Sequence, residues 1–183
     1  WPVSTPENPK QFQDILGKGR TLIQQTFDRF EGTVAAENIH VLTNDRYADQ
    51  VAEQLPEIPQ ENIICEPARR NTAPCLVYAG LRIRKIDPEA VMVVTPSDHV
   101  IEHTDKFIVN IETAVNVAVE QNAILTLGIK PSRTETGYGY IEFTGTSEID
   151  EVYPVVQFKE KPDKKTAAEY IASGNFYWNA GVF

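Results

Sequence analysis

Polar residues suited to binding phosphate, metal and sugar groups gather in four short clusters along the chain. The clusters are residues 66–74 (Glu-Pro-Ala-Arg-Arg-Asn-Thr-Ala-Pro), 96–99 (Pro-Ser-Asp-His), 136–140 (Thr-Gly-Tyr-Gly-Tyr) and 158–162 (Phe-Lys-Glu-Lys-Pro). Each cluster lies just past the end of an apolar, strand-like run. Ligands bind outside the carboxyl ends of the strands in an open parallel sheet. We therefore expect the four clusters to converge in space.

The first cluster combines two guanidinium groups with the predicted start of a helix. Arg69 and Arg70 stand immediately before Asn71 and Thr72, and Pro74 fits the first turn of the helix that follows. Unpaired backbone N–H groups and the positive end of the helix dipole favour an anion or the polar edge of a base there. The alternative is that Thr72 simply caps the helix while the arginines lie in solvent.

The second cluster offers a carboxylate that could hold a divalent cation. Asp98 follows the apolar run at residues 91–95, where the chain must turn sharply. Mg²⁺ commonly uses one or two protein carboxylates together with phosphate oxygens and water. The alternative is an aspartate that caps a turn. His99 and His103 lack a third ligand at metal-binding spacing, so the sequence does not predict a zinc site.

The third and fourth clusters have the chemistry of a sugar phosphate site. Gly137 and Gly139 flank Tyr138, which lets the backbone approach a ligand closely beside an aromatic ring. Glu160 can accept hydrogen bonds from sugar hydroxyls, and Lys161 can pair with a phosphate. The alternatives are a plain glycine turn and an exposed Lys-Glu-Lys charge run.

Two further residues outside these clusters are candidates of the same kind. Lys10 lies early in the chain, where a cation could neutralise a leaving group, although surface lysines are common. Asn179 precedes Gly181 at the end of the last apolar run. Its amide is either a sugar contact or part of a bulge.

Composition limits the classes of partner. The formal net charge of −9 argues against nucleic acid or an anionic membrane as the main partner, because both would be repelled at long range. The apolar runs are only strand-sized, and no signal peptide pattern is visible. Two cysteines do not suggest a disulfide framework, which favours reduced thiols and a cytoplasmic setting. A homodimer is left open.

The order of periodic segments predicts an α/β fold. Apolar spacing predicts helices near residues 22–30, 47–55, 74–86, 107–119 and 166–171, and strands near 39–42, 63–65, 91–95, 124–127, 140–143, 152–158 and 176–183. Strands that alternate with helices imply a parallel sheet, and the later strands an antiparallel addition. We expect a three-layer α/β domain, mostly parallel, with residues 1–183 as one continuous unit.

Six ordered motifs resemble one enzyme family closely. They are Trp-Pro followed by Pro-Lys-Gln-Phe, then the four clusters above, then Trp-Asn-Ala-Gly-Val-Phe at residues 178–183. In this order, and over the whole chain, they resemble the mannose-1-phosphate guanylyltransferases (GDP-mannose pyrophosphorylases) of the nucleotidyltransferase family. The Arg-Asn-Thr-Ala-Pro segment favours the guanylyl enzymes over their uridylyl, thymidylyl and adenylyl relatives.

The resemblance implies a reaction and a role for each candidate residue. The reaction joins GTP and mannose 1-phosphate into GDP-mannose and pyrophosphate with Mg²⁺ on a Rossmann-like nucleotidyltransferase fold. The implied catalytic residues are Lys10 at the triphosphate, Asp98 as a Mg²⁺ ligand and Lys161 at the sugar phosphate. The implied nucleotide-binding residues are Arg70, Asn71, Thr72, Pro74 and Ser97, and the implied sugar-binding residues are Tyr138, Gly139, Glu160 and Asn179.

The sequence departs from the family pattern at its two ends. Relatives carry a glycine-rich loop directly before the Trp-Pro motif, and a second metal carboxylate beyond the position of Phe183. We therefore expect residues 1–183 to be a partial catalytic domain, truncated at both ends and impaired by itself. The alternatives are an enzyme for another base or hexose 1-phosphate, and a non-catalytic protein that binds sugar nucleotides. A sugar transferase with an Asp-x-Asp motif is disfavoured, because no two aspartates are two positions apart.

Overall fold

The computed structural model describes residues 4–68, 71–147, 149 and 151–183. The chain forms two compact units, one within residues 1–120 and one within residues 121–183. We call them the N-terminal unit and the C-terminal unit and describe each by itself. The α/β class is confirmed, with one parallel and one antiparallel sheet among these residues.

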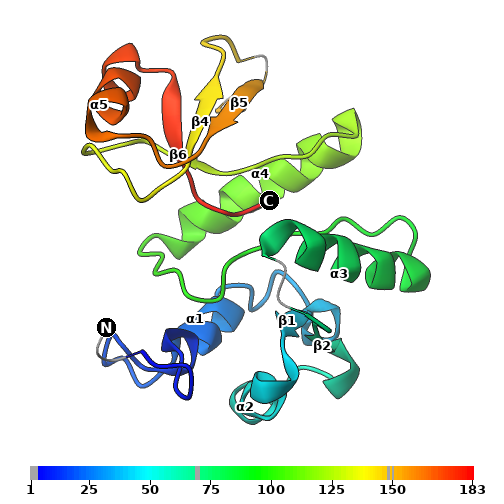
Figure 1. Cartoon of the computed structure of the whole chain (residues 1–183). Coiled ribbons are helices and arrows are strands. Elements are labelled where there is room, and N and C mark those ends of the chain that lie inside the picture. The colour runs from blue at the N-terminus through cyan, green and yellow to red at the C-terminus, as the bar shows by residue number, and fades with distance from the viewer. Residues whose placement is uncertain (1–3, 69–70, 148, 150) are drawn as a thin grey trace. The chain divides into compact units, whose positions relative to one another are not determined.

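The described part of the N-terminal unit contains a two-stranded parallel sheet and four α-helices (Figure 1). Its elements are η1 (Lys10–Phe12), α1 (Leu22–Asp28), β1 (Val41–Thr43), α2 (Ala48–Gln54), β2 (Ile63–Cys65), α3 (Thr72–Ile86) and α4 (Thr104–Gln121), with short 3-10 turns at Ala36–Asn38, Asp45–Tyr47 and Gln60–Asn62. The strands pair in register from Val41 with Ile63 to Thr43 with Cys65. The N–H of Glu66 then donates to the carbonyl of Thr43 at 2.8 Å, so pairing continues to the start of the first polar cluster.

The core of this unit explains why the predicted helix at residues 47–55 forms. Tyr47, Val51 and Leu55 recur every four residues and are all buried, together with Phe12 and Ile23. Residues four apart lie on one face of a helix. The apolar face of α2 therefore closes the core, and Phe12 ties η1 to it.

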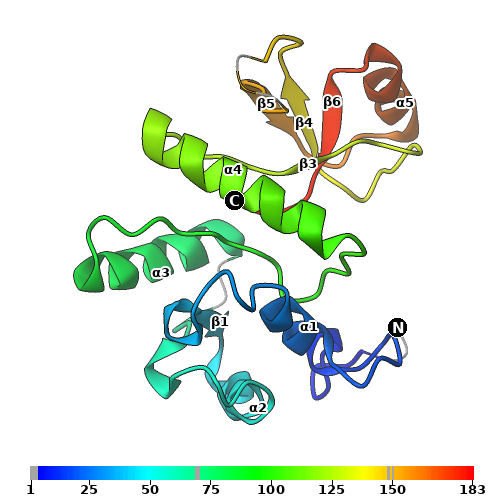
Figure 2. The same cartoon turned by 180° about the vertical axis from the view of Figure 1, so that it is seen from behind.

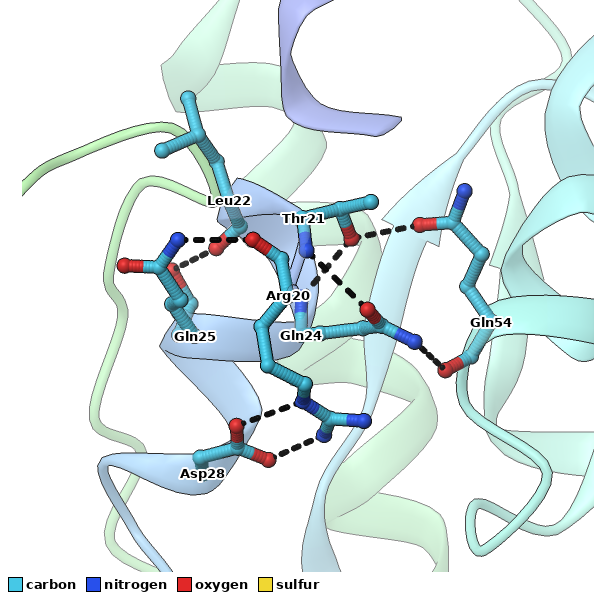
Figure 3. A network of polar contacts seen from close by, with 8 residues as sticks. Arg20, Thr21, Leu22, Gln24, Gln25, Asp28 and Gln54 are labelled. Carbon is cyan, nitrogen blue, oxygen red and sulfur yellow. Dashed lines mark hydrogen bonds and ion pairs between the residues drawn. The ribbon is translucent and has the colours of Figure 1, made fainter. Parts of the chain in front are cut away.

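A capping box fixes the start of α1 and links it to the end of α2 (Figure 3). The hydroxyl of Thr21 accepts from the N–H of Gln24 at 3.5 Å, and the N–H of Thr21 donates to the Gln24 side chain at 3.0 Å. Gln24 also donates to the carbonyl of Gln54 at 3.0 Å. Arg20 forms a two-point ion pair with Asp28 further along α1. The capping box thus sets where the helix predicted near residues 22–30 begins.

Two predicted strands are wrong. Residues 91–95 form no strand, and no described residue pairs with their backbone in a ladder. The strand predicted at residues 124–127 begins instead at Gly128, although Leu127 exchanges backbone hydrogen bonds with residues 180 and 182. An apolar run records a tendency to be buried, whereas a strand also needs a neighbour for its N–H and C=O groups.

The described part of the C-terminal unit is a four-stranded antiparallel sheet with one helix (Figure 2). Its elements are β3 (Gly128–Ile129), β4 (Tyr140–Phe143), β5 (Val155–Lys159), α5 (Lys164–Ser173) and β6 (Phe176–Asn179). The strand order is β3-β6-β4-β5. A buried cluster of Tyr140, Ala167, Phe176 and Trp178 packs α5 against this sheet.

The ends of α5 carry strong local signals. The carboxylate of Asp163 accepts from the N–H of Thr166 at 2.8 Å, and this bond lowers the pKa of Asp163. Gly174 ends the helix in the left-handed region, with φ of 77°.

Within the described part of the chain, no helix has the length and apolar character needed to cross a membrane.

Candidate functional site

Lys10 and Asp98 form an ion pair in the N-terminal unit. Their Nζ and Oδ2 atoms lie 2.7 Å apart, although the two residues come from η1 and from the turn that follows residues 91–96. Their side chains are 52% and 29% exposed, so solvent and ligands can reach both. A partly exposed ion pair of this kind contributes at most about 1 kcal/mol to stability. A charged ligand that binds one partner can offset the loss of that contribution. Ser97 precedes Asp98 in the same turn and is half-buried.

The start of α3 has an unusual backbone conformation. Asn71 is the N-cap residue, with φ of 64° and ψ of −172°, and its side chain makes no capping hydrogen bond. This region is populated almost only by glycine, and such strain tends to persist at functional sites. Thr72 is the first helical residue and not the cap, so the capping alternative for Thr72 is wrong. Pro74 lies in the first turn as predicted.

The remaining residues of this cluster frame the same helix start. Asn71 and Thr72 are exposed, which leaves the first turn of α3 accessible to a ligand. Burial and the neighbouring Glu66 carboxylate raise the pKa of Cys75 to about 11, so Glu66 lies beside the first turn of α3. Arg70, the remaining predicted nucleotide contact, lies outside the described residues.

The order of the antiparallel sheet brings three predicted sugar contacts together in the C-terminal unit. Gly139 precedes β4, Glu160 follows β5 and Asn179 ends β6. Because β4 runs antiparallel to both neighbours, its start lies beside their ends. The N–H of Asn179 donates to the carbonyl of Gly139 at 2.8 Å. All three residues therefore share one edge of the sheet.

Glycine at position 139 leaves room for a ligand beside Glu160. A methyl group on Gly139 would lie 3.3 Å from Oε2 of Glu160 and 3.7 Å from Cβ of Asn179. The side chain of Asn179 is held in place, because its Oδ1 accepts from the N–H of Gly181 at 2.9 Å. The carboxylate, the amide and the open backbone thus form a small polar cradle.

Lys161 adds a cation beside this cradle. Its Nζ lies 3.5 Å from Oε1 of Glu160, and both side chains are exposed. The backbone of Lys161 has φ of 35°, in the left-handed region. The turn thus presents a carboxylate and an ammonium group side by side to solvent.

The loop that carries Tyr138 is organised by Glu135, a residue that the motifs in the sequence did not indicate. The Glu135 carboxylate accepts from the N–H groups of Thr136 and Gly137, each at 3.0 Å. The bond from Gly137, then the bond from the Arg133 side chain, and then the bond from Thr136 lower the pKa of Glu135. Tyr138 packs edge-on against Trp178, with ring centroids 5.4 Å apart. A carboxylate two positions before a glycine is the signal that could have revealed this turn.

The comparisons with known proteins decide the family. The family model described as "Nucleotidyl transferase" matches residues 1–183. The chain belongs to the nucleotidyl transferase family. A mannose-1-phosphate guanylyltransferase of Escherichia coli (strain K12) is 41% identical over 190 residues, and the match covers the whole chain. The motif resemblance stated above is thus confirmed. The chain spans 39% of the length of that relative.

Solved structures extend the likeness of this nucleotidyl transferase to its fold. A crystal structure of mannose-1-phosphate geranyltransferase from Thermus thermophilus has a TM-score of 0.87 and 28% identity. The match covers all of this chain and 52% of the Thermus thermophilus chain. A crystal structure of mannose-6-phosphate isomerase from Helicobacter pylori has a TM-score of 0.80 and 27% identity, and covers 97% of this chain and 65% of its own.

The donor set of this nucleotidyl transferase limits how it could hold a metal ion. Among the described residues, no group of three or more His, Cys, Asp or Glu side chains could form a metal site. Asp98 is half-buried and close to a cation, Lys10. It fits a metal ion that takes one protein carboxylate and completes its shell with phosphate oxygens and water, as Mg²⁺ does. It does not fit a metal that needs a full set of protein ligands.

The structure thus joins the predicted residues into two groups. Lys10 and Asp98 meet in the N-terminal unit, whereas Gly139, Glu160 and Asn179 meet in the C-terminal unit. A common cleft for both groups stays a prediction.

Proposed function

We propose that the protein transfers GMP from GTP to mannose 1-phosphate and so gives GDP-mannose and pyrophosphate. The observation that carries this proposal is the 41% identity to a mannose-1-phosphate guanylyltransferase, which runs over the whole chain. The two groups of candidate residues have the chemistry that this reaction needs. We also propose that residues 1–183 belong to one catalytic domain.

The reaction needs positioned charge and no general base. A phosphate oxygen of mannose 1-phosphate is already ionised at neutral pH and attacks the α-phosphorus of GTP. The new bond joins this oxygen to the α-phosphorus, and the bond from that phosphorus to the oxygen bridging to the β-phosphate breaks. Pyrophosphate leaves in line with the attack. Alignment and electrostatic stabilisation of the phosphoryl group supply the catalysis.

Lys10 and Asp98 act at the triphosphate. The Lys10 ammonium offsets the charge that develops on the departing pyrophosphate, and Asp98 contributes one ligand to Mg²⁺. When bound, Mg²⁺ supplies charge neutralisation at the phosphate oxygens. The 2.7 Å ion pair supports this pairing of roles, because the two side chains already share one accessible position.

The start of α3 and the turn at residues 96–99 bind the nucleotide. Asn71, Thr72 and Pro74 present the N-terminal end of a long helix, which favours phosphate or a polar base edge. Arg70 adds a guanidinium from the preceding position, and Ser97 a hydroxyl. The strained backbone at Asn71 supports a functional role for this loop.

The cradle in the C-terminal unit binds mannose 1-phosphate. The Glu160 carboxylate accepts hydrogen bonds from sugar hydroxyls, and the Asn179 amide donates to them. Gly139 lets the sugar approach the backbone. Lys161 pairs with the sugar phosphate, and Tyr138 offers an exposed ring at the rim. The shared sheet edge and the fixed amide of Asn179 support this assignment.

We further propose a cytoplasmic protein, which its two free cysteines support. A homodimer stays open, and sedimentation of the purified protein would decide it.

A substrate panel tests the proposed function. Pyrophosphate release by the full-length protein should be fastest with GTP and mannose 1-phosphate, and much slower with UTP, dTTP, ATP or glucose 1-phosphate. It should stop when EDTA removes divalent cations. Preference for another nucleotide or hexose phosphate would replace the proposed substrates. Binding of GDP-mannose without turnover would replace the enzyme with a sugar nucleotide-binding protein.

A further inference from the structure

Arg29 is a buried cation without an acidic partner among the described residues. It caps the C-terminal end of α1 and is only 7% exposed, and no described carboxylate forms an ion pair with it. Burial lowers the pKa of its guanidinium from the ordinary arginine value. Desolvating an unpaired charge is costly, so a hydrophobic side chain of similar size would often be no less stable there. Arginine at this position therefore calls for an explanation other than stability.

The contacts of Arg29 lead to the loop that carries Asp98. Nη2 donates to the backbone carbonyl of His99 at 3.0 Å. The guanidinium carbon lies 5.5 Å from the centre of the Phe107 ring in the first turns of α4, and Phe107 packs edge-on against Phe30. The second nitrogen, Nη1, is buried and has no hydrogen-bond partner among the described residues. Arg29 thus connects α1, the loop and α4.

The same loop has little other support. The preceding residues 91–95 are not held in a sheet ladder within the described chain. Asp98 itself is fixed by Lys10, whose side chain is half exposed. In the described part of the chain, the backbone of residues 96–99 accepts a local side-chain hydrogen bond, from Thr95 to the Pro96 carbonyl at 3.4 Å, and a long-range one, from Arg29. The bond from Arg29 anchors the residue directly after Asp98.

We propose that Arg29 is a positioning residue that holds the loop at residues 96–99 and thereby orients the Asp98 carboxylate. The planar guanidinium suits this task, because one edge donates to the carbonyl while the face packs on an aromatic ring. A lysine ammonium is a point charge and lacks this planar set of donors. The kinetic part of this inference rests on the proposed function of Asp98, whereas the loop-holding part does not.

The test compares Arg29→Met with Arg20→Met in the full-length protein. Arg20 is a matched control, since it lies beside the same helix but pairs with Asp28 and does not contact the loop. Arg29→Met should speed hydrogen-deuterium exchange of the amides at residues 97–103 and lower kcat by about 10- to 100-fold. The unfolding temperature should stay the same or rise, because a buried charge is removed. Arg20→Met should leave exchange in the loop and kcat unchanged.

A double variant links the effect to Asp98. If Arg29 acts through Asp98, then Arg29→Met should slow the Asp98→Asn protein by no more than about twofold, because coupled residues are non-additive. Arg29→Lys should show the same changes in smaller degree, which keeps the test valid if Arg29→Met fails to fold. Unchanged exchange at residues 97–103 would overturn the inference whatever the reaction is. Full kcat in Arg29→Met beside a slow Asp98→Asn would also overturn it and leave the proposed function standing.

Discussion

At the scale of single residues, the pairing of Lys10 with Asp98 is the most informative contact. The sequence predicts a role for each residue separately, and the structure joins them at 2.7 Å. The ion pair is accessible, and separating its two side chains costs little free energy. This is expected if Lys10 leaves Asp98 to bind phosphate while Asp98 binds a metal ion. Their direct contact therefore gives a physical reason to assign both to the triphosphate.

Asp98→Asn should lower kcat by at least about 100-fold and change the KM for GTP much less. The substitution keeps the size of the side chain but removes the charge that binds a cation, and that charge matters most in the transition state. Steady-state pyrophosphate release measures both constants. Asp105→Asn, an exposed carboxylate in the first turn of α4, is the control. Full activity in Asp98→Asn would remove Asp98 from the mechanism.

Glu160→Gln should affect the sugar and spare the nucleotide. Loss of a charged acceptor for sugar hydroxyls should raise the KM for mannose 1-phosphate by about tenfold or more and weaken its preference over glucose 1-phosphate. The KM for GTP should stay the same. Glu169→Gln, on the exposed surface of α5, is the control. An unchanged sugar preference would contradict the role given to Glu160.

Cys75 should react slowly with alkylating reagents below pH 10. Burial first, and then the Glu66 carboxylate, raise the pKa of this thiol to about 11, so only about one molecule in a thousand carries the thiolate at pH 8. The rate of iodoacetamide labelling, followed by peptide mass spectrometry, should rise about tenfold for each pH unit up to pH 10. A rate that levels off near pH 8.5 would show an ordinary thiol.

At the scale of elements, the sequence predicted helices better than strands. The four-residue spacing of Tyr47, Val51 and Leu55 identified α2, because a helix is decided largely by its own residues. Residues 91–95 were wrongly predicted to form a strand. Strand pairing depends on a neighbouring strand, which an apolar run does not specify.

The candidate site was predicted in its residues but not in its geometry. Gly139, Glu160 and Asn179 were recognised separately, yet their meeting follows from the strand order β6-β4-β5, which no local pattern encodes. Glu135 and Arg29 were missed because each acts on backbone groups. The spacing of Glu135 and Gly137 was a readable local signal, whereas the backbone partner of Arg29 lies 70 positions away and leaves none.

Gly128→Ala should destabilise the C-terminal unit by about 1–3 kcal/mol. A methyl group on Gly128 would lie 2.8 Å from Cδ2 and 2.9 Å from Cβ of Tyr177, and rotation of the ring cannot relieve the second contact. The pairing of β3 with β6 should therefore loosen. Urea unfolding followed by circular dichroism measures the effect. Gly145→Ala is the control, because a methyl group on Gly145 would meet no atom within 4 Å apart from its chain neighbours. Equal stability of the two variants would contradict this packing argument.

At the scale of the whole molecule, an acidic chain is proposed to bind two anionic substrates. The formal net charge of −9 repels GTP and mannose 1-phosphate at long range. Local cations must therefore overcome this field, and Lys10 and Lys161 provide one in each unit. On the proposed function, the N-terminal unit serves the triphosphate and the C-terminal unit serves the sugar phosphate, so the reaction needs both.

The fate of the α-phosphorus of GTP is the decisive measurement for the proposed reaction. The full-length protein is incubated with mannose 1-phosphate, Mg²⁺ and GTP labelled at the α-phosphorus or, in a parallel reaction, at the γ-phosphorus. In-line attack on the α-phosphorus predicts that the α-label appears in GDP-mannose and the γ-label in pyrophosphate. Transfer of the γ-label to the sugar, or no labelled sugar nucleotide from an otherwise folded protein, would contradict it.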